Sequence, residues 1–160
     1  MTVTTIEKDT EELTLTLVAD FAAPVEAVWE LWADPRKLER WWGPPGYPAT
    51  FEQHDLTPGA LSTYFMTGPD GDRHYGWWRI ATVDPPRELT MQDGFGDNEG
   101  RPITDLTGLM RMRLIEHDGG TRMELLDQFP SLEQMEEMLK MGMEEGLREA
   151  VGQMDALLDG

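Results

Sequence analysis

Few side chains in this 160-residue sequence have the types and spacing that catalysis requires. The three histidines, His54, His74 and His117, lie in separate segments and form neither an HxxxH nor an HExxH pattern, so they do not predict a metal site. A buried imidazole beside a carboxylate can act as a general base. The catalytic candidates are therefore His74, Asp93 and Asp127, which strand alternation allows to face an interior cavity. The alternative is that each is a polar residue at a strand end.

The sequence also lacks the motifs of several common enzyme classes. It contains no cysteine, which excludes thiol catalysis, zinc–thiolate sites and disulfides. No GxSxG or P-loop pattern is present, and Gly94-Phe95-Gly96 leads into no predicted helix. We therefore expect no metal and no cofactor, and the sequence favours a binding protein over an enzyme.

Methionine and aromatic side chains form the second set with a chemical use. The chain has 11 methionines, and thioethers are flexible and polarisable, so they suit a cavity that accepts varied shapes. Periodicity places most of them on inward faces. The alternative is that the methionines and tryptophans fill the core and that two helical glycines are packing notches. The predicted ligand-binding residues are Trp41, Tyr64, Met66, His74, Trp78, Met91, Phe95, Met110, Met112, Met123, Met135, Met138, Gly142, Met143 and Gly146.

The elements that must position these side chains are mainly strands. Residues 1–12 form a polar lead-in, and alternating leucines over residues 13–17 predict a strand that runs to about Phe21. A helix then opens at Pro24, and a second short helix begins at Pro35. Gly-, Pro- and Asp-rich turns separate the later strands. These strands are predicted over residues 49–55, 60–67, 74–83, 88–93, 104–116 and 121–129.

A long amphipathic helix is predicted from Ser131 to about Leu158. Ser131 and Gln134 match a capping box, and apolar residues recur on one helical face. Gly142 and Gly146 lie on that face at a cost of about 1 kcal/mol each relative to alanine, so close packing or a ligand must offset them. This helix, about 40 Å long, is the element that can cover a curved antiparallel sheet. The order predicts an α+β fold with a cavity between sheet and helix.

Composition and charge restrict the partners. The chain has 13 Lys and Arg against 31 Asp and Glu, a net charge of −18, so it should repel nucleic-acid phosphates and anionic lipid. The first ten residues lack the basic and apolar regions of a signal peptide, and no apolar run approaches the roughly 20 residues of a membrane span. We therefore expect a cytoplasmic protein with one domain over residues 1–160 and with no nucleic-acid or membrane partner.

Several short motifs resemble those of one protein family. Residues 21–29, FAAPVEAVW, are similar to the APxxxVW opening of the SRPBCC superfamily, which includes the START and birch-pollen-allergen folds. Residues 34–44 resemble the DPxxLxxWWGP signature of its heat-shock-protein-90 ATPase activator-like branch. Later motifs of that branch recur in order up to residues 119–122, so the resemblance covers about residues 12–158. Ala60 and Leu147 depart from it, because the branch usually has a second glycine and a helical tryptophan there.

The resemblance implies a helix-grip fold, in which a curved antiparallel sheet wraps around a long C-terminal α-helix and two short helices follow the first strand. It also implies binding of a small hydrophobic or aromatic ligand in the cavity between sheet and helix. Related proteins include a co-chaperone and polyketide cyclases. A co-chaperone-like interaction module and a cyclase- or hydrolase-type enzyme therefore remain as alternatives, with a chaperone or a second copy of the chain in a homodimer as protein partner.

Overall fold

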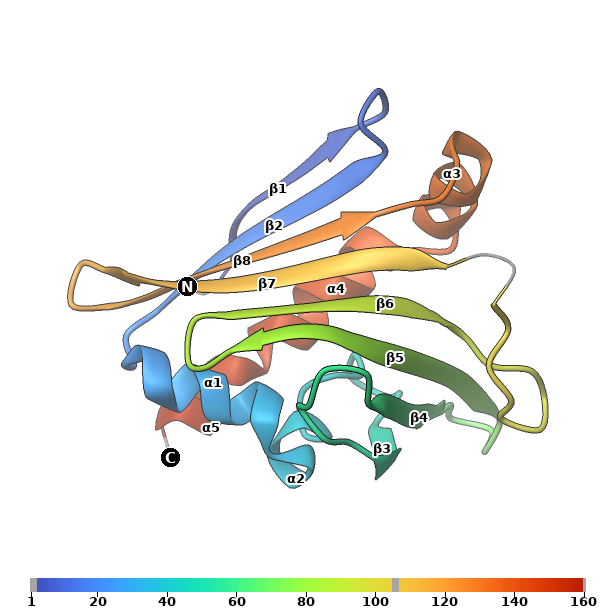
Figure 1. Cartoon of the computed structure of the whole chain (residues 1–160), viewed down its shortest axis with the longest axis horizontal. Coiled ribbons are helices and arrows are strands. Elements are labelled where there is room, and N and C mark those ends of the chain that lie inside the picture. Colours follow the sequence, from blue (N-terminus) through green and yellow to red (C-terminus); the bar gives the residue numbers. More distant parts are fainter. Residues whose placement is uncertain (1–2, 105–106, 160) are drawn as a thin grey trace.

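An eight-stranded antiparallel sheet forms most of the computed structural model, which describes residues 3–104 and 107–159 (Figure 1). The strand order is β1-β2-β8-β7-β6-β5-β4-β3, so every neighbouring pair except β2–β8 is consecutive along the chain. The strands are β1 (Val3–Asp9), β2 (Thr14–Phe21), β3 (Ala49–Gln53), β4 (Leu61–Thr67), β5 (Arg73–Asp84), β6 (Glu88–Phe95), β7 (Gly108–His117) and β8 (Gly120–Gln128).

Five helices complete the part of the chain that the structure describes. Two short helices, α1 (Val25–Ala33) and α2 (Pro35–Leu38), connect β2 to β3, as predicted. The C-terminal helices are α3 (Leu132–Lys140), α4 (Met143–Gly152) and α5 (Met154–Asp159). Figure 1 shows α4 crossing one face of the sheet behind β6 and β7, with α5 beside α1. The α+β helix-grip architecture is therefore confirmed. None of the described helices is long and apolar enough to cross a lipid bilayer.

Alternation along the strands decides which side chains enter the core. Met110, Met112 and Leu114 of β7 are buried, whereas the intervening Arg111 and Arg113 are exposed. The inner side of the sheet is therefore apolar and the outer side is charged, because successive side chains of a strand point to opposite faces. The predicted strand over residues 104–116 begins only at Gly108, and residues 105–106 lie outside the described part.

The first strand corrects the prediction of a polar lead-in. β1 pairs with β2 from Val3, opposite Ala19, to Asp9, opposite Thr14. The carboxylate of Asp9 closes the hairpin by accepting hydrogen bonds from two following backbone N–H groups, at 3.0 and 3.1 Å. Few apolar residues mark this segment, so its strand state depends on the unpaired edge that β2 offers.

The C-terminal helix is not continuous, which corrects the prediction of one helix over residues 131–158. Ser131 caps the start as expected, since its Oγ accepts a hydrogen bond from the backbone N–H of Gln134 at 3.1 Å. Gly142, however, adopts a left-handed backbone with φ of 91° and begins a new helix. This conformation is accessible to glycine without steric cost. The interruption lets α3 leave the line of α4 at the end of the sheet (Figure 1).

Candidate functional site

A cavity of about 300 Å³ lies between the sheet and the junction of α3 and α4. Strands β4, β6, β7 and β8 form one wall, and the two helices form the other. The residues that line it are Trp42, Tyr64, Met66, Asp93, Phe95, Met110, Asp127, Met138, Met141, Gly142, Met143, Gly146 and Leu147.

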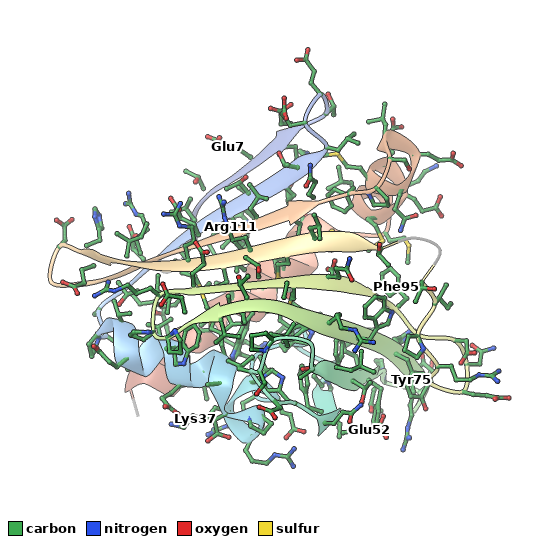
Figure 2. All side chains as sticks on the ribbon, in the orientation of Figure 1. Glu7, Lys37, Glu52, Tyr75, Phe95 and Arg111 are labelled. Atoms are coloured by element: carbon green, nitrogen blue, oxygen red, sulfur yellow. The ribbon has the colours of Figure 1, made fainter. Side chains whose placement is uncertain are left out.

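Exposed apolar side chains mark the mouth of this cavity. Phe95 is 47% exposed and Met141 is 73% exposed, although both line the cavity. Figure 2 shows Phe95 at the same end of the sheet as Tyr75, away from α1. A smaller adjoining space of about 70 Å³ shares Tyr64, Asp93 and Asp127 with the main cavity. The site is therefore open at the sheet end where α3 begins.

Tryptophans from the segment after α2 close the inner end. Trp42 packs edge-to-face against Trp78, with ring centroids 4.9 Å apart, and against Tyr64 at 6.1 Å. Asp34 fixes this segment by capping α2, because its Oδ1 accepts a hydrogen bond from the backbone N–H of Arg36 at 2.9 Å. The indole N–H of Trp42 is buried and has no hydrogen-bond partner among the described residues. The ring of Trp42, rather than its buried N–H, therefore forms this end of the cavity wall.

Two carboxyl groups stand on this otherwise apolar wall. Asp93 of β6 and Asp127 of β8 flank β7 from either side, opposite Gly108 and Met110 respectively. Gly108 leaves room for the Asp93 carboxyl, since a Cβ at Gly108 would lie 2.8 Å from Asp93 Oδ1. Asp127 is only 6% exposed. Both acids therefore occupy a desolvated setting that ordinarily selects apolar residues.

Burial changes the protonation of both acids. It raises the pKa of Asp93 from its ordinary 3.8 to about 6. The pKa of Asp127 is raised well above its ordinary value, first by burial and second by the negative charge of Asp93. No lysine, arginine or histidine is among the described residues that line the cavity. The pair therefore resists double ionisation, because no cation compensates the second charge.

Tyr64 supplies a neutral hydroxyl beside the acids. Gly76 lies opposite Tyr64 on β5, and the ring of Tyr64 fills the space that a side chain at Gly76 would need. Burial, with the negative charges of Asp93 and Asp127 adding to it, raises the pKa of the Tyr64 hydroxyl. The hydroxyl therefore keeps its proton and can donate a hydrogen bond.

The structure brings many of the predicted site residues together around the cavity. Both predicted acids, Asp93 and Asp127, line it. So do the predicted ligand-binding residues Tyr64, Met66, Phe95, Met110, Met138, Gly142, Met143 and Gly146.

Other predicted ligand-binding residues lie outside the cavity. Strand alternation identifies the inner face but not the position along it, and packed side chains fill much of that face. The buried core, rather than the cavity lining, contains Trp41, Trp78, Met91, Met112, Met123 and Met135.

His74 is a further correction. It lies near the start of β5 with an exposed side chain, and its Nε2 is 2.6 Å from Asp72 Oδ2. It does not line the cavity, so the proposed catalytic pairing of His74 with a buried acid has no geometric basis. The predicted alternation of side chains along β5 was right. The strand extends beyond the end of the cavity, however, so His74 lies outside the site.

The prediction omitted three lining residues, Trp42, Met141 and Leu147. Trp42 directly follows the selected Trp41, and only the packing of the α2 segment determines which ring faces the cavity. Leu147 stands where the related branch usually has tryptophan, and this departure is the feature of the sequence that could have identified Leu147 as a lining residue. Met141 becomes part of the mouth because the helix ends there, which periodicity does not reveal.

The buried histidine has a structural role. The ring nitrogens of His54 lie 2.8 Å from Ser62 Oγ and 2.8 Å from the carbonyl oxygen of Trp32. Burial lowers the pKa of His54, so the neutral imidazole ties β4 to α1. Among the described residues, no three or more His, Asp or Glu side chains gather in a group that could hold a metal ion.

Comparison with known proteins gives the family. Residues 22–159 match the family model described as "Activator of Hsp90 ATPase homolog 1-like protein". Two solved structures are each 48% identical: protein Ms6760 from Mycobacterium smegmatis, with a TM-score of 0.90 over 98% of this chain and 96% of that one, and a protein from Arthrobacter aurescens, with a TM-score of 0.94 over 99% and 92%.

A more distant structure shares the fold alone. DynU16, from the dynemicin biosynthetic locus, is 19% identical with a TM-score of 0.68, over 92% of this chain and 47% of that one. No curated protein matches the chain. The family match spans most of the sequence and agrees with the helix-grip architecture. The chain therefore belongs to the family of activator of Hsp90 ATPase homolog 1-like proteins.

Proposed function

We propose that this protein binds a small hydrophobic or aromatic molecule in the cavity between the sheet and the α3–α4 junction. The cavity itself carries the proposal: about 300 Å³ of space is lined by methionines and aromatic rings and opens past Phe95 and Met141. Sites for small molecules are typically concave, mostly apolar and supplied with a few polar groups. At roughly 30 Å³ for a water-sized group, the space suits about ten non-hydrogen atoms.

The lining chemistry supports a ligand of variable shape. Met66, Met110, Met138 and Met143 approach the space from both walls. Their side chains adjust to the molecule they contact and make favourable contacts with aromatic rings. Trp42 contributes its aromatic ring at the inner end. An apolar ring or short chain would therefore enter at Phe95 and lie along the methionines.

A cavity-filling variant tests the proposal. Gly146 lies on the cavity wall and a Cβ there meets no atom within 4 Å, so Gly146→Phe should occupy the space without disturbing the fold. We expect naphthol, phenylbutanol or decanol to bind the parent in calorimetric titration and to bind Gly146→Phe at least about tenfold more weakly.

The control is Gly152→Phe, because Gly152 is exposed and a Cβ there also meets open space. It should bind as the parent does. The proposal is wrong if none of the three compounds binds the parent, or if Gly146→Phe binds them with the parent's affinity.

The acid pair favours a second candidate, an enzyme of the cyclase or hydrolase type. A buried acid that is protonated near neutral pH can act as a general acid, and its ionised neighbour as a general base. Asp93 and Asp127 have the raised pKa values this requires. Turnover of an aromatic ester or polyketide that Asp127→Asn abolishes, while ligand binding persists, would support it.

The family description favours a third candidate, a co-chaperone-like module. A chaperone that recognises a chain with a net charge of −18 would need a basic surface. Measuring the ATPase rate of a purified Hsp90-type chaperone with and without this protein tests the role, and an unchanged rate removes it.

A further inference from the structure

We infer that the cavity takes a ligand whose apolar body carries a positively charged amine, with the ammonium group placed between Asp93 and Asp127. This inference rests on the proposed function, since it assigns the chemical class of the molecule bound in the same cavity. Three observations carry it: the position of the acids, the absence of a cation in the described lining, and the aromatic rings around them.

The position of the acids comes first. Both lie on the cavity wall formed by the sheet, and Asp127 is more than nine-tenths buried. Among the described residues, Asp127 makes no side-chain hydrogen bond or ion pair to an arginine, lysine or histidine, whereas Asp20 is held by Arg122 at 2.8 and 3.0 Å. A buried carboxyl without a partner is costly. A ligand that donates to it would remove that cost.

The charge balance of the cavity decides which ligand does so. Tyr64, Asp93 and Asp127 are the titratable groups of the described lining, and none of them is cationic at neutral pH. A carboxylate ligand would add a further negative charge beside the acids. A neutral ligand would leave them uncompensated. An ammonium group supplies both the charge and the hydrogen-bond donors that two carboxyl groups accept.

The surrounding rings suit a cation as well. Trp42, Tyr64 and Phe95 line the same space, and the faces of aromatic rings attract ammonium groups. A metal ion fits less well, because Ca²⁺ takes six to eight oxygen ligands and the described lining offers two carboxyl groups and one hydroxyl. The net charge of −18 also raises the local concentration of cations at the protein surface.

Three compounds with the same phenylbutyl tail separate the alternatives. Phenylbutylamine is cationic, phenylbutanol is neutral and phenylbutanoate is anionic near neutral pH. In calorimetric titration of the full chain, we expect the amine to bind at least about tenfold more tightly than the alcohol, and the anion to bind more weakly than either.

Variants then locate the preference. In Asp127→Asn and Asp93→Asn the advantage of the amine over the alcohol, compared within each variant, should fall to about threefold or less. Each variant replaces an acid by a neutral group of the same shape, so the fold should persist, and thermal denaturation checks this. Glu136→Gln removes one negative charge from the exposed face of α3, and it should keep the parent's preference.

The outcomes distinguish this inference from the proposed function. Equal binding of amine and alcohol, tighter binding of the anion, or an amine preference that survives both Asp variants overturns the inference and leaves the proposed binding of an apolar molecule in the cavity standing. Failure of all three compounds to bind overturns the inference and the proposed function together. Loss of all binding in Gly146→Phe confirms that the measured site is the cavity.

Discussion

Asp93 and Asp127 occupy positions where the sheet would ordinarily place apolar side chains. Each shares its inner face with methionines, and each has a raised pKa because burial disfavours the charged form. Such residues lower the stability of the folded state near neutral pH, and they persist in proteins where a site requires them. At the scale of single residues, this pair is therefore the feature of the molecule that most needs a functional explanation.

Replacing one acid by its neutral equivalent should stabilise the protein at high pH. The pKa of Asp93 is about 6 in the folded state, above its ordinary 3.8, so protonated Asp93 favours folding below about pH 4 and that contribution is lost as the pH rises through 6. Asp93→Asn stays neutral at every pH. We expect it to unfold with a free energy about 1–3 kcal/mol greater than the parent at about pH 8.

The difference should shrink as the pH falls and approach zero at about pH 3, where Asp93 is protonated in both the folded and the unfolded state. Urea denaturation at both pH values measures it. His54, whose pKa is lowered by burial, titrates in parent and variant alike and cancels from the comparison. Glu136→Gln is the control, and a pH-independent difference for Asp93→Asn would contradict the assigned pKa.

At the scale of elements, the break between α3 and α4 shapes the cavity. Gly142 takes a left-handed backbone at the N-cap position immediately before α4, and Gly146 lies one turn later with open space beside it. The two glycines looked equivalent in the sequence because both fall on the apolar face. Their backbones differ, so one is needed for the turn and the other leaves room in the cavity.

Alanine substitutions should therefore act in opposite directions. Gly142→Ala should lower the free energy of unfolding by roughly 1–2 kcal/mol, since φ of 91° is unfavourable for a residue with a Cβ. Gly146→Ala should raise it by about 0.5–1 kcal/mol, because alanine is the better helix former and no atom lies within 4 Å of its Cβ. Urea denaturation of both variants checks this. Stabilisation by Gly142→Ala would show that the helices join in solution.

At the scale of the whole molecule, the negative charge opposes compaction. With 31 acidic against 13 basic residues, repulsion between exposed carboxylates destabilises the folded state at low ionic strength. The ion pairs are mostly exposed, as in Lys8 with Glu144 and Arg101 with Asp97, and such pairs contribute little. The destabilising repulsion between exposed carboxylates should therefore outweigh the stabilisation that the ion pairs contribute.

Salt should stabilise this protein. Raising sodium chloride from about 0.01 to 0.1 M shortens the Debye length from about 30 to 10 Å, so the melting temperature should rise by several degrees. Potassium chloride should have the same effect if screening is the cause. A melting temperature that falls with salt would mean that the exposed ion pairs outweigh the repulsion.

Local sequence patterns determined most of the elements. Alternation in β2 and β7, the Pro24 and Pro35 helix starts and the Ser131 cap follow from the residues themselves, because backbone geometry fixes the periods of two and 3.6. The strand β1 could not be predicted in this way, because its polar sequence forms a strand only against the free edge of β2. The break at Gly142 could not be predicted from the sequence either, because glycine is also permitted within a helix and tertiary packing selects its left-handed backbone.

The same division applies to the site. Alternation along the strands correctly predicted the face of the sheet that carries the cavity-lining residues, which include Tyr64, Met66, Met110 and the two acids. Tertiary structure alone decided that His74 lies beyond the cavity, that Trp42 rather than Trp41 lines it, and that Asp93 and Asp127 share it across β7. Periodicity fixes the direction of a side chain from its own backbone, whereas the extent of a cavity depends on how far the opposing helices cover the sheet.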